Sequence, residues 1–113
     1  MKTRKIIWDD EAKKSLRSIY DYIKSRESVS TALRIRNEII KQVKILPKYP
    51  EKFTREPYFI NQSDNIRFKV IWSYKIIYEI TERNILVLDI FHTSRNPSEI
   101  DVRIEISPSQ NNW

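Results

Sequence analysis

The segment FHTSRNP, residues 91–97, contains the only histidine of the chain, three residues before an arginine. An imidazole titrates near neutral pH, so His92 can act as a general acid or a general base. The guanidinium of Arg95 can bind a phosphate through two parallel hydrogen bonds. Metal-free cleavage of RNA needs both properties, because it transfers protons and builds negative charge on phosphorus oxygens. His92 and Arg95 are therefore the first candidates for chemistry.

Basic and aromatic side chains upstream of this segment extend the candidate site. Positive charge can come from arginine and lysine, and tryptophan or tyrosine can stack on a base. The predicted catalytic residues are His92, Arg67, Lys75 and Arg95. The predicted residues for binding a nucleic acid or another target are Arg67, Lys69, Lys75, Arg95, Trp72 and Tyr74. The chain has no second histidine and no glutamate placed clearly as a base, so the sequence leaves open whether it is an enzyme.

Each of these residues also has a structural interpretation. His92 can be a hydrogen-bonded residue that ends a strand, and Arg95 can close a turn by binding backbone carbonyls. Arg67 and Lys69 can simply be solvated on an exposed face of a sheet. Lys75 can pair with neighbours on its own strand.

Glycine and cysteine are both absent. Phosphate-cradling loops and dinucleotide fingerprints need glycine for close approach of the backbone, so P-loop and Rossmann sites are excluded. Protein zinc sites use mainly cysteine and histidine ligands, so a single histidine without cysteines does not favour a zinc site. We therefore predict no metal and no cofactor.

The composition describes a basic chain of 113 residues, with 21 basic and 15 acidic side chains and a formal net charge of +6. This length fits one domain. The excess charge suits an acidic or polyanionic partner, although a charged surface alone would also explain it. The lack of cysteine favours a reducing compartment, and no apolar run reaches the length of a signal peptide or a membrane span. We expect a cytoplasmic protein with no membrane partner.

Apolar periodicity predicts two helices after a short first strand. The strand is RKIIW, residues 4–8. Apolar residues then recur at intervals of three and four through residues 10–26, with Asp9 placed to cap the helix. A second stripe covers residues 30–46, with Ser30 as its cap and prolines after its end. The short link between them predicts an antiparallel hairpin of helices.

Period-two alternation predicts three strands in the second half, at residues 66–72, 75–80 and 84–91. Their short links predict an antiparallel meander. YFI, residues 58–60, is a possible further short strand.

Alternation along the strands also predicts which side chains face the helices. The face toward the helices is expected to carry Phe68, Val70, Trp72, Ile76, Tyr78 and Ile80. The opposite face is expected to carry Arg67, Lys69 and Lys75. A basic face would then lie beside the strand end that carries His92.

These elements predict an α+β fold in the order β-α-α-β-β-β, an antiparallel sheet with a two-helix hairpin packed on one face. Residues 1–100 would form a single domain. Residues 101–113 would be a C-terminal tail or a short extra strand.

Five motifs, taken in order and at their spacing, resemble the RelE/ParE superfamily of bacterial type II toxins. WDDEA opens the first predicted helix, SIYDYI closes it, and LPKYP follows the second. YKIIYEI stands where the family has a Tyr-Arg-hydrophobic-hydrophobic-Tyr strand, and DIFHTSRNP ends the last strand. The resemblance covers residues 4–97. The paired tyrosines of the helix and the His-x-x-Arg-x-Pro ending are more similar to ParE-like members.

The resemblance implies a small basic toxin, of the plasmid stabilisation type, that a cognate antitoxin neutralises by wrapping around it, with a toxin–antitoxin heterotetramer as a possible assembly. ParE-like members bind DNA gyrase and lack the nuclease residues. RelE-like members are ribosome-dependent endonucleases that cut mRNA, which makes an mRNA interferase the alternative function. Lys75 stands where nuclease members commonly have arginine, so the charge is kept and the planar fork is lost. We therefore expect a ParE-like gyrase inhibitor.

Overall fold

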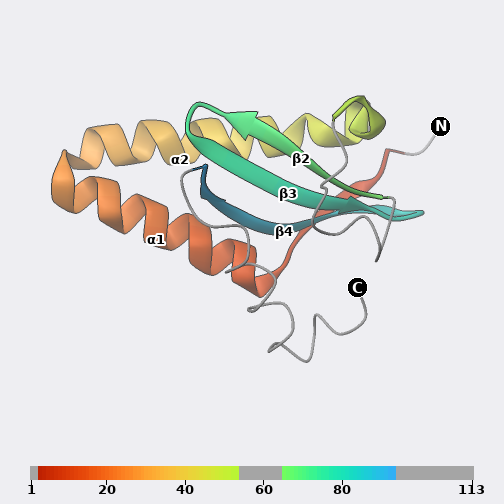
Figure 1. The fold of residues 1–113 in the computed structure, drawn as a ribbon, viewed down its shortest axis with the longest axis horizontal. Coiled ribbons are helices and arrows are strands. Elements are labelled where there is room, and N and C mark those ends of the chain that lie inside the picture. Colours follow the sequence, from red (N-terminus) through yellow and green to blue (C-terminus); the bar gives the residue numbers. More distant parts are fainter. Residues whose placement is uncertain (1–2, 54–64, 94–113) are drawn as a thin grey trace.

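The computed structural model describes residues 3–53 and 65–93 as two helices on one side of a four-stranded sheet (Figure 1). The elements are β1 (Lys5–Trp8), α1 (Asp10–Arg26), α2 (Val29–Lys44), the 3-10 turns η1 (Leu46–Lys48) and η2 (Pro50–Lys52), β2 (Ile66–Ile71), β3 (Tyr74–Ile80) and β4 (Asn84–His92). The predicted α+β fold class and order of elements are confirmed. Residues 58–60, Arg95 and residues 101–113 lie outside the described residues, so the predictions for them, and the domain limits, stay predictions.

The sheet has the strand order β1-β4-β3-β2. β2 and β3 are antiparallel, as are β3 and β4, which confirms the predicted meander. β1 instead runs parallel to β4, with Lys5 opposite Asn84 and Trp8 opposite Val87. The sheet is therefore mixed, and the prediction of a wholly antiparallel sheet is wrong for this pair. A parallel pair needs a long connection, and two helices and two strands intervene between β1 and β4.

Local capping explains where the helices begin. Asp9 caps α1 as predicted, because its Oδ2 accepts a hydrogen bond from the backbone N–H of Glu11 at 3.3 Å. The cap of α2 is Ser28, whose Oγ accepts from the N–H of Thr31 at 3.0 Å. The prediction of Ser30 is therefore wrong by two residues, because α2 begins at Val29 and Ser30 already lies inside the helix. Within the described ranges, no helix combines the length and apolar character needed to cross a bilayer.

The main core fills the space between the helix hairpin and the sheet. Its buried members are Ala12, Ile39, Val43, Leu46, Ile71, Ile76, Tyr78, Ile80, Ile85, Val87 and Ile90. Ile76, Tyr78 and Ile80 face the helices as predicted. Tyr78 is fully buried, and its hydroxyl donates to the Pro50 carbonyl at 2.6 Å. This bond satisfies the buried hydroxyl and ties η2 to the centre of the sheet.

A second buried cluster lies on the opposite face of the sheet and corrects the prediction for β2. It contains Ile66, Ile77, Leu88 and Phe91, with Phe68 packed against it. Phe68 and Val70 therefore point away from the helices, and Val70 is 50% exposed. Ile71 is the β2 residue that reaches the main core.

The pairing of β2 with β3 determines which side chains of β2 face the helices, because residues directly opposite each other share a face. Val70 lies opposite Lys75, and Lys69 lies opposite Ile76, which faces the helices. Lys69 and Arg67 are thus on the helix side, at the edge of the sheet. Long basic side chains can occupy such a position by extending their polar ends past the apolar core.

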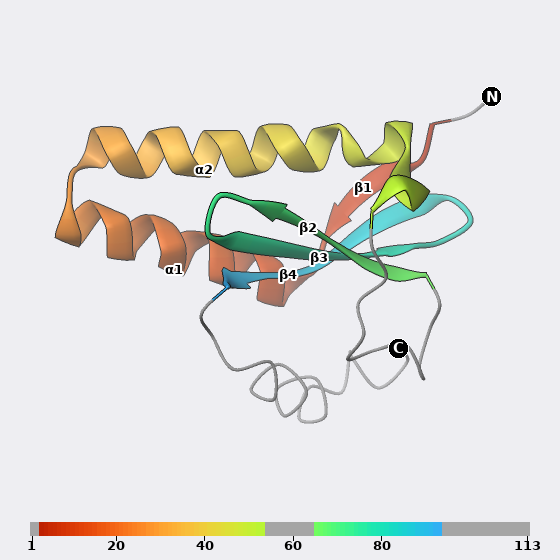
Figure 2. The same ribbon diagram turned by 45° about the horizontal axis from the view of Figure 1, so that its top comes forward.

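The β2–β3 turn and the last residues of β4 lie at the same end of the sheet, beneath the helix hairpin (Figure 2). The antiparallel register explains this, since Tyr74, the first residue of β3, lies opposite His92, the last of β4. Residues from three separate segments can therefore form one surface at that end.

Candidate functional site

His92 and Tyr74 meet at the end of the sheet. Their rings are 5.5 Å apart between centroids and almost perpendicular, at 86°. An edge-to-face contact of this kind is the favoured arrangement of two rings and holds the imidazole in a defined orientation. His92 is exposed to solvent, whereas Tyr74 is half-buried. Burial is the main cause that raises the pKa of the Tyr74 hydroxyl, with a smaller contribution from Glu27.

Trp72 occupies the two-residue turn between β2 and β3 and has a left-handed backbone, with φ of 52°. Such turns usually take glycine at this position, and the chain has none. The conformation costs a non-glycine residue about 1–3 kcal/mol. The side chain of Trp72 is nonetheless 55% exposed, and the guanidinium of Arg34 on α2 lies 5.8 Å from its ring. Trp72 therefore combines a strained backbone with an exposed aromatic ring.

We call Arg34, Trp72, Tyr74 and His92 the strand-end surface. A cleft of about 710 Å³ lies on one side of it, against α1, and is lined by Tyr74, His92 and residues of α1 that include Tyr22. A smaller cleft of about 360 Å³ lies against α2 and is lined by all four residues of the surface. His92 and Tyr74 therefore form a ridge between two clefts.

Arg67 and Lys69 lie elsewhere and are bound into the fold. Nη1 of Arg67 donates to the carbonyls of Glu51 and Phe53, at 3.2 Å and 2.7 Å. Nζ of Lys69 donates to Oε1 of Gln42 on α2 at 2.5 Å and lies 4.9 Å from the centre of the Phe53 ring. Burial, and then the nearby charge of Lys52, lower the pKa of Lys69. These two cations hold the segment after α2 against the edge strand, and the prediction that they display charge on an exposed face is wrong.

Lys75 is on the other side of the sheet. Its Nζ lies 4.1 Å from the centre of the Phe68 ring and 5.8 Å from that of Phe91. The predicted basic face of Arg67, Lys69 and Lys75 is therefore divided between the two faces of the sheet. Cation–π contacts of this kind hold the ammonium over the second apolar cluster.

The predicted residues thus occupy three places among the residues that the structure describes. Trp72, Tyr74 and His92 come together at the strand end, Arg67 and Lys69 brace the segment after α2, and Lys75 covers the opposite face. A general acid or base must come within hydrogen-bond reach of the group it serves, and phosphate-binding cations must surround the same phosphate. The described part of the predicted set does not converge in that way.

Sequence reasoning missed Arg34, because only the folded hairpin brings its guanidinium to Trp72. It also missed a row of cations on α1, namely Lys13, Arg17 and Lys24. The sequence spacing could have predicted this row, since Arg17 and Lys24 follow Lys13 by four and eleven residues and such positions fall on one face of a helix. The prediction for this helix used only its apolar stripe, which marks the buried face and not the exposed one.

Comparison with known proteins agrees with this fold. A model of the family described as the ParE toxin of type II toxin–antitoxin system, parDE, matches residues 6–97. Among solved structures, the chain is similar to a chain of the chromosomal ParDE TA system from P. aeruginosa, with 20% sequence identity and a TM-score of 0.69, covering 81% of this chain and 98% of that one. This likeness concerns the fold. No curated protein matches the chain. The family match spans most of the sequence, and the chain therefore belongs to the ParE toxin family of type II toxin–antitoxin systems.

Proposed function

We propose that this toxin acts by binding DNA gyrase rather than by cleaving RNA, and that a cognate antitoxin neutralises it. Membership of the ParE family supports the class of target. The net charge of +6 supports an acidic antitoxin, which would bind more weakly as salt screens the charges. A toxin–antitoxin heterotetramer is the assembly we propose.

The observation that carries the proposal is the separation of two predicted catalytic cations, Arg67 and Lys75, from His92. Arg67 donates to two backbone carbonyls at one end of β2, while Lys75 lies over aromatic rings on the opposite face. Neither side chain can reach a phosphate held at His92 without breaking the contacts that fix it. Electrostatic stabilisation of a phosphorane depends on groups already in position. A binding function needs no such convergence.

The strand-end surface is the part of the toxin that we assign to the target. Tryptophan, tyrosine and arginine are the residue types that most often carry the binding energy of protein interfaces. Here they occur together, with an exposed tryptophan on a strained turn and clefts on both sides of the ridge. A protein partner can insert side chains into the clefts and cover the exposed ring.

A ribosome-dependent mRNA endonuclease is the second candidate. One observation favours it, namely an exposed imidazole held edge-to-face against Tyr74 at the mouth of a cleft. Histidine and tyrosine can both transfer protons, and an aromatic ring can stack on a splayed base. This candidate needs a phosphate-binding cation other than Arg67 and Lys75.

Two assays on the purified toxin separate the candidates. Gyrase supercoiling activity is measured in one, and mRNA integrity in a translation extract in the other. We expect inhibition of supercoiling with intact mRNA. Trp72→Ala should weaken the inhibition about tenfold or more, as expected for an interface anchor. Tyr49→Ala, which removes a ring that is 66% exposed and does not line either cleft of the strand-end surface, is the matched control and should change little. Cleaved mRNA with unaffected supercoiling would establish the endonuclease instead.

A further inference from the structure

A buried carboxylate that the proposed function does not use lies near the end of β4. Among the described residues, Asp89 is the one charged side chain that is buried, with 3% of its surface exposed. Its Oδ1 accepts a hydrogen bond from the Ser15 hydroxyl of α1 at 2.6 Å and another from the backbone N–H of Ile90 at 2.8 Å. A buried carboxylate is costly unless donors of this kind compensate it. An aspartate at this depth therefore needs a physical reason.

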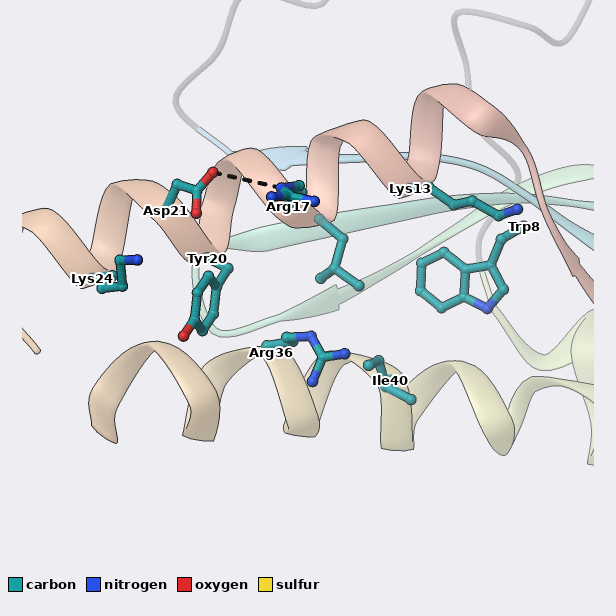
Figure 3. A pocket seen from close by; sticks show the side chains of 9 residues that line it. Trp8, Lys13, Arg17, Tyr20, Asp21, Lys24, Arg36 and Ile40 are labelled. Atoms are coloured by element: carbon teal, nitrogen blue, oxygen red, sulfur yellow. Dashed lines mark ion pairs between the residues drawn. The ribbon is translucent and has the colours of Figure 1, made fainter. Parts of the chain in front are cut away.

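Ser15 lies on the side of α1 that borders the strand-end surface. Another side of the same helix, with Lys13 and Arg17, lines an outer groove of about 480 Å³ between α1 and α2 (Figure 3). Ser15 instead lines the cleft of about 710 Å³ that His92 also lines. The hydrogen bond from Ser15 to Asp89 therefore joins α1 to β4 beside the strand-end surface.

Asp89 adjoins a bulge in β4. Across the ladder with β3, Tyr78 lies opposite Val87, and the preceding residue, Ile77, lies opposite Asp89. Leu88 is therefore an extra residue on the β4 side of the ladder. One extra residue reverses the alternation of all later side chains between the two faces of the sheet.

The two apolar clusters show this reversal. Before the bulge, Ile85 and Val87 belong to the main core beneath the helices. After it, Ile90 belongs to the same core, although it follows Ile85 by an odd number of residues, and Phe91 belongs to the cluster on the opposite face. In a regular strand, side chains an odd number of residues apart lie on opposite faces. The bulge therefore determines which face each residue after it occupies.

The bulge places His92 on the helix side of the sheet. His92 follows Ile85 by an odd number of residues, so a regular strand would carry it on the face away from the helices. It lies instead opposite Tyr74, which packs against the main core, and the two rings are 5.5 Å apart. The next residue, Thr93, donates its N–H to the Ser73 carbonyl at 2.8 Å and ties the end of β4 to the β2–β3 turn.

We propose that Asp89 and Ser15 are positioning residues that hold this bulge and thereby set the geometry of the strand-end surface. The inference rests on the proposed function, because that surface is the one assigned to the target. Apolar residues stand on both sides of Asp89, so burial of apolar groups alone also permits a register without the bulge. In that register Asp89 would lie opposite Ile76, and its carboxylate would enter the main core, where it is unfavourable. In the bulged register the same carboxylate accepts from Ile90 and reaches α1.

Two substitutions at one position separate the accepting oxygen from the rest of the side chain. Asp89→Ala removes the oxygen that accepts from Ser15 and Ile90, together with the penalty on the register without a bulge. Asp89→Asn keeps an accepting oxygen at the same place. The matched control for a general loss of stability is Arg4→Ala, which removes a partly buried hydrogen bond to the Thr81 carbonyl in the β3–β4 turn, at the other end of β4.

The register is measured by proton NMR on the full-length toxin. Because the chain has a single histidine, its imidazole signals are assigned directly, and a nuclear Overhauser effect between the rings of His92 and Tyr74 reports the bulged register. Inhibition of gyrase supercoiling is measured on the same samples, with circular dichroism as the check on folding.

We expect Asp89→Ala to lose the Overhauser effect and to inhibit supercoiling about tenfold more weakly, because the ridge, both clefts and the tie to the β2–β3 turn all depend on the end of β4. Asp89→Asn and Arg4→Ala should keep the effect and inhibit within about threefold of the wild type. If Asp89→Ala does not fold, Ser15→Ala replaces it, and the Overhauser effect should fall by about half, because one of the two donors is lost.

An Asp89→Ala variant, or its Ser15→Ala replacement, that keeps the full Overhauser effect would overturn the inference. Loss of the effect in Asp89→Ala with unchanged inhibition would also overturn it, since the bulge would then not serve target binding. Loss in Arg4→Ala would indicate a general consequence of lower stability, and loss in Asp89→Asn would assign the role to charge; either result overturns the inference. Failure of the wild type to inhibit supercoiling would contradict the proposed function instead, and the Overhauser effect would still test the bulge.

Discussion

The two ends of the edge strand β2 hold their chemically active side chains in opposite ways. At one end, Arg67 donates to two backbone carbonyls of the segment after α2, so its charge is used within the fold. At the other end, Trp72 is 55% exposed on a turn with positive φ. The first arrangement stabilises the structure, whereas the second leaves a strained residue exposed to solvent. Residue type alone therefore does not show whether a side chain is used within the fold or is exposed to solvent, whereas its contacts do.

The largest expected effect of a substitution at the structural end is that of Arg67→Ala. It removes both hydrogen bonds to the carbonyls of Glu51 and Phe53, and we expect the free energy of unfolding to fall by about 2 kcal/mol. Arg17→Ala is the matched control, because that side chain is 85% exposed and should change stability by less than about 0.5 kcal/mol. Urea unfolding measures both. Similar values for the two variants would mean that Arg67 is no more structural than a surface residue.

Tyr78→Phe removes the hydrogen bond to the Pro50 carbonyl. We expect this change to lower the free energy of unfolding by about 1 kcal/mol at neutral pH. The same residue should govern unfolding at high pH. Burial raises the pKa of Tyr78 well above its usual value, so the folded protein keeps a proton that the unfolded chain releases above about pH 10. The stability from this group is complete below that pH and is lost as the pH rises toward the folded pKa.

Urea unfolding at a series of alkaline pH values tests this sign. The wild type should lose stability steeply above about pH 10, and Tyr78→Phe should lose less over the same range. Tyr49→Phe, at an exposed position, should follow the wild type. A Tyr78→Phe curve as steep as that of the wild type would show that other groups cause the alkaline loss.

At the Trp72 end of β2, substitution should have a small and opposite effect on stability. Trp72→Gly relieves the positive φ, and we expect the free energy of unfolding to rise by up to about 1 kcal/mol while inhibition of the target falls. Ser73→Gly changes the neighbouring turn residue, which has no positive φ, and should lower stability by about 0.5–1 kcal/mol. Thermal unfolding compares the two. A Trp72→Gly variant that is much less stable than the wild type would mean that the tryptophan is held for packing.

Local features explain which parts of this fold were predictable. Asp9 and the apolar stripe that follows it define α1 within a few residues, because capping and helical periodicity depend only on near neighbours. The short links between β2, β3 and β4 likewise permit only a meander. The parallel pairing of β1 with β4 depends on the path of the whole chain, and nothing within β1 specifies it.

The faces of β2 were not predictable for a related reason. The strand carries apolar residues on both faces, with Phe68 on one and Ile71 on the other, so alternation alone permits either orientation. The pairing of Val70 with Lys75 decides between them. Three of the candidate site residues, Trp72, Tyr74 and His92, were nonetheless brought together, because the meander places the start of β3 and the end of β4 at the same end of the sheet. Their functional role remains a prediction.

The central claim, that the toxin binds its target and does no chemistry, is tested most directly by His92→Gln. Glutamine can keep one hydrogen bond at this exposed position but cannot shuttle a proton, so removal of a general acid or base should lower a reaction rate by about 10²–10⁴. Growth after induction is measured for the wild type and for His92→Gln, with circular dichroism to verify the fold of the variant. The account predicts that the variant still kills, with potency within a few-fold of the wild type. Full loss of killing by a folded His92→Gln protein would contradict it and establish His92 as a catalytic residue.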